Sequence, residues 1–318
     1  MIAAMSAVVA VPAMAQPARA FRIAWVSSDR ADTGSPSLAA FRAGLRELGY
    51  VDDRDFVVET WWGEGSTERL ARMTGEILAS RPDVIVAQGG QSLRPIMAAD
   101  TTTPIVFGMS ADPVEARVVA SYARPGGNVT GMSFFALDLV GKRMELMKQA
   151  MPGIRRVAVV ANPEHPGEHK ERAVSQAAAR DLGLAMHYLP VRSEAELDAA
   201  LAAIAKARDD AILAFADAFT LGFAHRFAEF AVRQRIPAVS GWAAFARQGN
   251  LMTYGPVIAE SYRRMASYVD RIRKGAKPAE LPVEFPTKVE LVVNAGAAQR
   301  IGLSIPSAVL ARADEVIR

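Results

Sequence analysis

One stretch has the residue types and spacing of a metal site. His165, Glu168 and His169 form the letters HxxEH, the spacing of an inverted zinc-protease motif. That chemistry requires both imidazoles on one face of a helix. Pro166 and Gly167 lie inside the match and oppose a helix that spans it. We therefore expect a loop here that leads into a helix at Glu168, and no metal site.

Several catalytic chemistries lack the residues or motifs that they need. The chain has no cysteine, which excludes thiolate catalysis, cysteine-ligated zinc, iron–sulfur clusters and a lipid-modified amino-terminal cysteine. It contains no Walker A sequence, no GxSxG elbow and no three-glycine dinucleotide fingerprint. The spacing of residues nominates no pair of nucleophile and base. We therefore expect neither a catalytic residue nor a cofactor.

Small and polar residues recur at the points where the predicted strands end. These stretches are 27–29, 88–91, 108–112, 162–164, 217–219 and 241–242. In an open parallel sheet, ligands bind beyond the carboxyl ends of the strands. Gly and Ser leave backbone N–H groups free at the start of the next helix, which suits a carboxylate or another anion. Aromatic residues such as Trp242 and Tyr254 would supply an apolar wall.

These residues also have a purely structural interpretation. Asp112 before Pro113 is a typical helix N-cap, and Asn162 before a proline is a typical turn initiator. Ser28 and Ser110 are common turn residues. We favour the functional interpretation because such residues recur at the same end of successive strands in both halves of the chain.

The residues between these positions must form the elements that hold them in place. Short apolar runs, which are typical of strands, alternate there with amphipathic runs of helical spacing. The first series predicts strands at 21–27, 56–62, 82–87, 104–107 and 129–134, and helices at 36–48, 66–80, 91–99 and 114–122. The second predicts strands at 156–161, 185–190, 211–216, 238–240, 251–254 and 288–294. Its predicted helices are 138–150, 168–182, 194–207, 219–234, 258–274 and 295–301.

Strands that are apolar throughout are buried on both faces, so the alternation predicts parallel sheets covered by helices. Two such series predict an α/β fold with two Rossmann-like, doubly wound lobes joined by a hinge. A TIM barrel is the alternative. The break at 125–127 and the second start at Arg156 favour two open sheets.

The amino terminus has the pattern of an export signal. Residues 1–15 are an apolar run that ends in Ala13-Met14-Ala15, a small-x-small sequence that signal peptidase accepts. The run lacks a basic residue before Arg19 and is too short to span a bilayer. We expect 1–20 to be a signal peptide and leader, cleaved near Ala15, and the mature chain to be periplasmic.

The charge pattern does not suggest a nucleic-acid partner. The chain carries 37 Lys and Arg against 34 Asp and Glu, a net charge of +3, and the charges are interspersed. No block of like charge would follow a phosphate backbone.

Six stretches resemble the ABC transporter substrate-binding protein family, which includes tryptophan- and tyrosine-type binding components. They are FRAGLRELGY at 41–50, RPDVIV at 81–86, DPV at 112–114, RPGGNVTG at 124–131, GAKPAELPV at 275–283 and LARADEVI at 310–317. The resemblance covers nearly all of 21–318. Residues 88–90, Gln-Gly-Gly, depart from the small residue or Thr of many members, so the ligand identity does not transfer.

The resemblance implies a type I periplasmic-binding-protein fold, with two lobes joined by three crossings. We expect the first lobe at 21–134 with 254–285, the second at 135–253, and a carboxyl-terminal segment, 286–318, that returns across the hinge. The crossings are expected near 134–138 and 249–254 and, from the family alone, near 281–288. Carried over by position, the ligand-binding residues are Ser28, Gln88, Gly89, Ser110, Asp112, Asn162, Asp217, Trp242 and Tyr254.

These expectations together describe a monomeric, extracytoplasmic solute-binding protein of an ABC importer. It would capture a small carboxylate ligand, an amino acid or an aromatic acid, and deliver it to a membrane permease driven by an ATPase. One alternative is a ligand-sensing module of the same fold that reports to a receptor. Another is an enzyme that uses Asp112 and Asp217 across the cleft.

Overall fold

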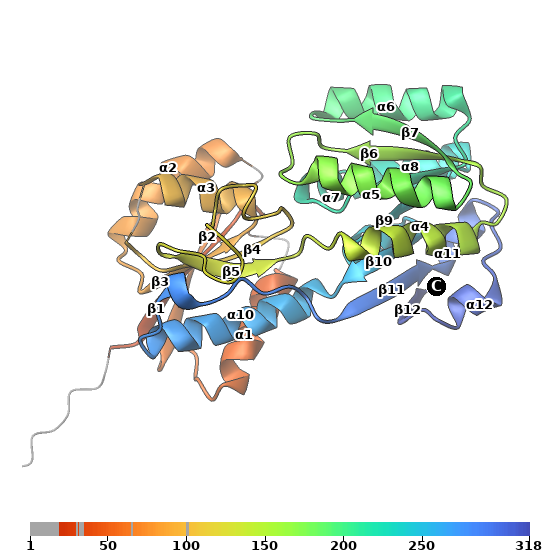
Figure 1. Ribbon diagram of the computed structural model, residues 1–318. Coiled ribbons are helices and arrows are strands. Elements are labelled where there is room, and N and C mark those ends of the chain that lie inside the picture. Colours follow the sequence, from red (N-terminus) through yellow and green to blue (C-terminus); the bar gives the residue numbers. More distant parts are fainter. Residues whose placement is uncertain (1–18, 30, 32–34, 65, 100–101) are drawn as a thin grey trace, which may run out of the picture.

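The computed structural model of the chain describes residues 19–29, 31, 35–64, 66–99 and 102–318. The described residues form two α/β lobes that lie side by side (Figure 1). The predicted signal peptide lies outside the described residues, apart from the last two positions of its leader. None of the described helices is both long and apolar enough to cross a membrane.

In the described residues, the first lobe is built on a five-stranded parallel sheet with the order β2-β1-β3-β4-β5. Its strands are β1 (Phe21–Ser27), β2 (Phe56–Trp62), β3 (Val84–Gln88), β4 (Ile105–Met109) and β5 (Val129–Ser133). Its helices are α1 (Pro36–Glu47), α2 (Thr67–Ala79), α3 (Gly90–Ala99) and α10 (Ile258–Arg273). Helices α1 and α10 cover one face of the sheet, and α2 and α3 cover the other (Figure 1).

The alternation of side chains along β1 explains why both faces are apolar. Trp25 faces α1 and α10, where its ring lies 5.5 Å from that of Phe41 and 5.6 Å from that of Tyr262. Its neighbour Val26 faces the other way and packs with Leu70 of α2. Because successive side chains of a strand point to opposite faces, a continuously apolar strand needs helices on both sides.

The second lobe contains a seven-stranded sheet of described residues with the order β12-β11-β10-β9-β8-β6-β7. Strand β11 runs antiparallel to β10, whereas β6 to β10 are mutually parallel. The strands are β6 (Arg156–Ala161), β7 (Ala185–Pro190), β8 (Ala211–Ala214), β9 (Ala238–Ser240), β10 (Met252–Pro256), β11 (Val289–Asn294) and β12 (Glu315–Ile317).

Helices also cover both faces of the second sheet. Residues of α4 (Asp138–Ala150) and α5 (Glu168–Asp181) pack on one face, and those of α6 (Glu194–Ala207) and α8 (Ala224–Gln234) pack on the other. The shorter elements are α7 (Ala218–Gly222), α9 (Ala243–Arg247), α11 (Ala295–Arg300) and α12 (Ser307–Leu310).

Within the described residues, the chain passes between the lobes three times. The passages are 134–137 between β5 and α4, Val257 between β10 and α10, and 281–288 between the 3₁₀ turn η2 (Pro278–Glu280) and β11. The third passage pairs with the end of β5, just before the first passage, and with the second passage. The N–H of Ser133 donates to the carbonyl of Glu284 at 3.0 Å, and the N–H of Val257 donates to that of Lys288 at 3.0 Å. The three passages therefore form one narrow, hydrogen-bonded hinge.

The predicted α/β fold of two lobes and most predicted elements are confirmed, and two separate sheets exclude a single closed barrel. The predicted helix at 114–122 is wrong, because the structure has turns there. Arg117 adopts a left-handed φ of 57°, and the N–H groups of Val118 and Val119 both donate to the carbonyl of Pro113. Asp112 still caps this segment as an N-cap would, but the chain turns instead of continuing as a helix.

Candidate functional site

The loops after β4 and β6 bring the two lobes into direct contact. The side-chain oxygen of Ser110 lies 3.0 Å from Nε2 of His165. Nearby, the N–H of Asp112 donates to the carbonyl of Pro166 at 3.3 Å. These contacts join the carboxyl end of β4 to the carboxyl end of β6, the place where open parallel sheets bind ligands.

A small cavity lies between the lobes beside the first hinge passage. Its volume is ≈ 10 Å³, room for about one water molecule. Its lining comes from both lobes and the hinge: Ser110, Phe134, Phe135, Ala136, Leu137, Arg143, Glu171, Ala216, Trp242 and Pro256. The predicted residues Ser110 and Trp242 thus meet at one place.

Two charged side chains line this cavity from helices of the second lobe. Arg143 of α4 is only 2% exposed; its Nε donates to the carbonyl of Tyr254 at 3.0 Å and its Nη1 to Oε1 of Glu171 at 3.3 Å. Burial lowers the pKa of Arg143. Burial also raises the pKa of Glu171 to about 7, an effect that nearby Arg143 opposes and the charge of Asp217 reinforces.

Asp217 lies near Glu171, and His165 lies near Asp217, which adds two more titratable groups to this region. Asp217 is buried at the start of α7, where its Oδ1 accepts from the N–H of Thr220 at 2.7 Å. Burial raises the pKa of Asp217, although the His165 ring opposes this shift. Burial lowers the pKa of His165, which favours its neutral form, although the charges of Asp217, Glu168 and Glu115 oppose this shift.

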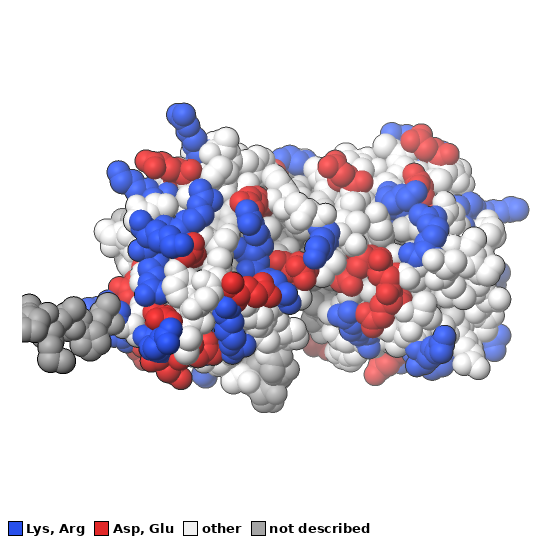
Figure 2. Space-filling view, turned by 90° about the horizontal axis from the view of Figure 1, so that it is seen from below, with Lys and Arg blue, Asp and Glu red and all other residues white. Residues whose placement is uncertain are grey.

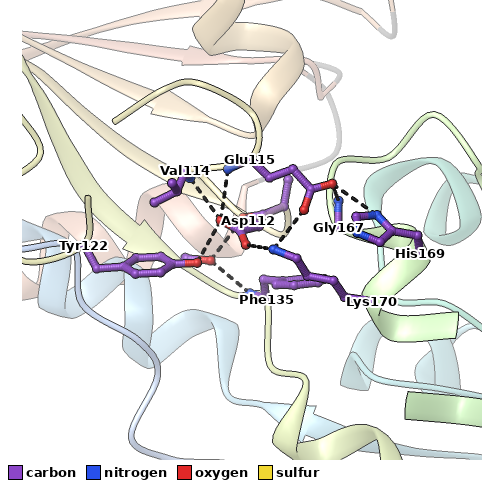
Figure 3. Close-up of polar contacts among 10 residues, drawn as sticks. Asp112, Val114, Glu115, Tyr122, Phe135, Gly167, His169 and Lys170 are labelled. Carbon is purple, nitrogen blue, oxygen red and sulfur yellow. Dashed lines mark hydrogen bonds and ion pairs between the residues drawn. The ribbon is translucent and has the colours of Figure 1, made fainter. Parts of the chain in front are cut away.

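Outside the cavity, an interlobe ion cluster of Asp112, Glu115, His169 and Lys170 joins the two lobes (Figure 3). The Lys170 ammonium lies 2.7 Å from Asp112 and 2.9 Å from Glu115. The N–H of Gly167 donates to Glu115 at 3.0 Å. Gly167 has a φ of 95°, and a Cβ there would lie 2.6 Å from the Phe135 ring, so only glycine fits at this close approach.

Asp112 is the centre of this cluster on the side of the first lobe. It accepts hydrogen bonds from the N–H groups of Val114 and Glu115, at 3.0 and 3.2 Å, and from the Tyr122 hydroxyl at 2.8 Å. Burial alone would raise its pKa. Hydrogen bonds from Lys170 and Tyr122 outweigh burial and hold the pKa of Asp112 below its ordinary value. The same ammonium lowers the pKa of Glu115.

The other first-lobe candidates are neutral hydrogen-bonding groups. Gln88 donates from Nε2 to Asp29 at 2.9 Å, and its buried Oε1 has no partner among the described residues. Gly89 has a φ of 82°, which favours glycine, and its N–H donates to the carbonyl of Gly108 at 2.7 Å. Ser28 is half-buried in the turn after β1.

The remaining second-lobe candidates occupy different environments. Asn162 accepts from the N–H of Glu164 at 3.0 Å, the local turn contact that its position before a proline predicts. Tyr254 lies in β10 and offers its carbonyl, not its ring, to Arg143. Trp242 is half-buried, precedes α9 and lines the cavity.

Sequence reasoning missed Arg143, Glu171 and Lys170, because these residues lie on helices and not at strand ends. A signal was present in the helical pattern. Arg143 lies on the same buried stripe of α4 as Met144 and Met147. The buried face of α5 likewise carries Glu171 among its residues. A charged residue on the apolar side of an amphipathic helix is expensive to bury and marks a candidate site.

The face seen in Figure 2 carries basic and acidic side chains intermixed over both lobes. Exposed pairs such as Arg263 with Glu47 at 2.8 Å and Arg247 with Glu315 at 2.6 Å illustrate this balance of charge. Among the described residues on that face, neither sign forms a continuous stripe of the kind that binds a phosphate backbone.

Two α/β lobes with a polar cavity at their hinge define a type I periplasmic-binding-protein fold. A solved protein from Vibrio cholerae O1 biovar El Tor has the same architecture, with a TM-score of 0.83 and 26% identity over 94% of this chain and all of that one. The profile of the ABC transporter substrate-binding protein family matches residues 31–317, so the chain belongs to that family. The family consists of substrate-binding proteins and not of enzymes, as the six sequence stretches predicted.

Two further relatives have names that mention a ligand. A Streptococcus pneumoniae protein solved in complex with L-Trp has a TM-score of 0.84 and 22% identity, covering 94% of this chain and all of that one. A Clostridioides difficile protein named "Tyrosine-binding protein" is 20% identical over 264 residues, which cover 81% of this chain and 75% of that protein.

Proposed function

We propose that this chain is the extracytoplasmic binding component of an ABC importer. It captures a small ligand with a carboxylate, an amino acid or an aromatic acid, and delivers it to a membrane permease. The observation that supports this proposal best is the cavity at the hinge, which polar and aromatic side chains of both lobes line together. The chain works as a monomer, with the signal peptide removed near Ala15.

Ligand capture follows from the hinge. A ligand that contacts both lobes does so only when they are closed, so its differential affinity shifts the open–closed equilibrium towards the closed form. The closed form then presents to the permease a surface that joins both lobes. No bond in the ligand needs to break.

The ligand contacts in this proposal come from both lobes, and two of them, Ser110 and Trp242, line the cavity. Ser28, Gln88, Gly89 and Ser110 supply hydroxyl, amide and N–H groups from the first lobe. The second lobe supplies Asn162, Asp217, Trp242 and Tyr254, and Asp112 acts through the interlobe ion cluster. Aromatic amino acids are the first candidates, because one relative is named a tyrosine-binding protein and another was solved in complex with L-Trp.

Titration calorimetry tests the proposal. The mature chain is titrated with each common L-amino acid and with benzoate and arylpropionates, and mass spectrometry identifies whatever co-purifies with it. We expect saturable binding of one ligand per chain for at least one compound, with no chemical change in that compound. The absence of any binder from the panel, or turnover of a bound compound, would contradict the proposal.

The transport role needs its own test. Deletion of the gene from its native host should abolish uptake of the radiolabelled ligand, and the wild-type gene should restore it. Unchanged uptake together with a lost transcriptional or chemotactic response would instead indicate a sensory module.

A further inference from the structure

The strongest unassigned feature is the pair of charged side chains that lines the cavity. Arg143 and Glu171 are both at least nine-tenths buried and belong to different helices, α4 and α5. A charge-assisted hydrogen bond has a typical length of about 2.7–2.9 Å. The separation of 3.3 Å between Nη1 and Oε1 is longer than that, whereas the more exposed Lys170 lies 2.7 Å from Asp112. The pair is thus buried at the cavity but only loosely joined.

Arg143 is held in place independently of Glu171. Its Nε donates to the carbonyl of Tyr254, and a Cβ on Gly241 would lie 2.7 Å from its Nη2, so the guanidinium lies directly against the backbone there. Hydrogen bonds among the described residues use its Nε and Nη1. A guanidinium has five N–H donors, so Arg143 can bind a further acceptor without leaving its position.

We propose that Arg143 and Glu171 form a recognition pair for a zwitterion: on binding, the ligand carboxylate contacts Arg143 and the ligand ammonium contacts Glu171. This inference rests on the proposed function and narrows its ligand class. It selects an α-amino acid over an aromatic acid that lacks an amino group.

Charge balance within the cavity supports a zwitterion over a simple carboxylate. The Arg143 guanidinium pairs with Glu171, and a second buried carboxyl group, that of Asp217, lies near Glu171. A ligand with only a carboxylate would compete with Glu171 for Arg143 and would leave Glu171 without a positively charged partner. A zwitterion gives each member of the pair an opposite charge, and buried charges are tolerated when they are paired and hydrogen-bonded.

The same pair predicts a proton linkage with a definite sign. Three groups act on Glu171, namely Arg143 on α4, Glu168 on α5 and Asp217 before α7, and His165 in the loop after β6 lies near Asp217. An ammonium beside Glu171 favours the carboxylate form and lowers its pKa from about 7. Binding of an amino acid therefore releases a proton, and the affinity rises with pH up to about 7 and falls below it, by at most about tenfold per pH unit. A ligand with only a carboxylate would give the opposite dependence.

A matched ligand series tests this inference on the wild-type chain. The compounds are L-tyrosine, 3-(4-hydroxyphenyl)propionate, which lacks the amino group, and tyramine, which lacks the carboxylate; the tryptophan series is run in parallel. Calorimetry in two buffers of different ionisation enthalpy measures affinity and proton release together. We expect the amino acid to bind at least about tenfold more tightly than either analogue and to release a proton near pH 7, since each analogue leaves one buried charge unpaired.

The variant Glu171→Gln separates charge from shape. It should abolish proton release and the preference for the amino acid over the propionate. Glu145→Gln is the control, because Glu145 belongs to α4 but is exposed and paired with Lys142 outside the cavity. Thermal unfolding shows whether each variant folds. If Glu171→Gln does not fold, the ligand series on the wild type still decides.

The outcomes distinguish the inference from the proposed function. Equal or tighter binding of the propionate, or proton uptake on binding the amino acid, would overturn the recognition pair and leave a carboxylate-binding protein intact. Failure of every compound of the panel to bind would overturn both.

Discussion

The two lobes contribute different chemistry to the same cavity. The first lobe offers the neutral hydroxyl of Ser110, from the loop after β4. The second lobe offers Arg143 and Glu171 from the faces of helices. In the proposed mode of binding, the second lobe therefore selects the charge of the ligand. The first lobe adds hydrogen bonds to the ligand when the lobes close.

The largest effect is expected from Arg143→Met, which removes the charge on the second-lobe side. It leaves Glu171 and the Tyr254 carbonyl buried without their partner, so unfolding free energy should fall by about 3 kcal/mol and ligand affinity by about 100-fold or more. The stability loss should shrink as the pH falls below 7, because Glu171 is then protonated and neutral. Urea unfolding and calorimetry measure both quantities. The control is Arg233→Met, at an exposed position of α8. Wild-type ligand affinity in Arg143→Met would contradict the idea that the second lobe selects the charge of the ligand.

A smaller effect is expected from the first lobe. Ser110→Ala removes the hydroxyl that contacts Nε2 of His165, and one neutral hydrogen bond is worth about 1 kcal/mol. We expect a ligand affinity about fivefold weaker, with little change in unfolding free energy. Ser80→Ala, at the distant end of α2, is the control. A loss of ligand affinity as large as that of Arg143→Met would mean that the first lobe contributes as much to ligand selection as the second lobe.

An effect on ligand binding as large as that of Ser110→Ala is expected when the interlobe ion cluster is weakened. This effect should change only the stability of the closed form. Lys170→Met should speed ligand dissociation about fivefold, because the Lys170 side chain is 40% exposed and such pairs contribute about 1 kcal/mol. Stopped-flow kinetics measures the rate, and small-angle X-ray scattering should show a more open average shape. Lys206→Met, at the exposed end of α6, is the control.

The pH dependence of this effect sharpens the comparison. The pKa values of Asp112 and Glu115 are lowered by the cluster, so its contribution is present at neutral pH and lost as the pH falls through those lowered values. The difference between Lys170→Met and wild type should therefore stay constant near pH 7, where the recognition pair titrates, and disappear only in acid. A difference that changed near pH 7 would show that the two groups of charges are coupled.

The smallest effect is expected from His169→Gln. The His169 side chain is 60% exposed and its Nδ1 lies 3.3 Å from Glu115, so dissociation should change less than about twofold. The same kinetic measurement checks this. A larger change would mean that the cluster depends on His169 and not on Lys170.

Much of the fold could be predicted from local sequence. Ser35, Pro36 and Gly49 predict a helix at 36–48, and α1 occupies Pro36–Glu47, with the Ser35 hydroxyl accepting from the N–H of Leu38. The failure at 114–122 has a physical cause. Asp112 and Pro113 form a good start for a helix, but contacts with Tyr122 and the second lobe hold the following residues in turns. Such tertiary contacts are not visible in local spacing.

The site was predicted unevenly for the same reason. The rule that ligands bind beyond the carboxyl ends of strands can be applied to each sheet separately. It correctly predicts that Ser110 and Trp242 lie at the cavity. Arg143 reaches the cavity only because α4 follows the first hinge passage and packs beside β10. That arrangement depends on how both lobes are joined, which neither composition nor periodicity specifies.

The position of α10 has a consequence for how the chain acquires its fold. This helix follows ten of the described strands in sequence, yet Tyr262, Met265 and Tyr268 complete the apolar core around Trp25 in the first lobe. A nascent chain that ends at residue 134 would leave one side of its sheet without that cover. The first lobe therefore cannot be completed before residue 273 has been synthesised, and the second lobe, whose sheet includes β12, cannot be completed before residue 317, so neither lobe is finished while the chain between them is being made.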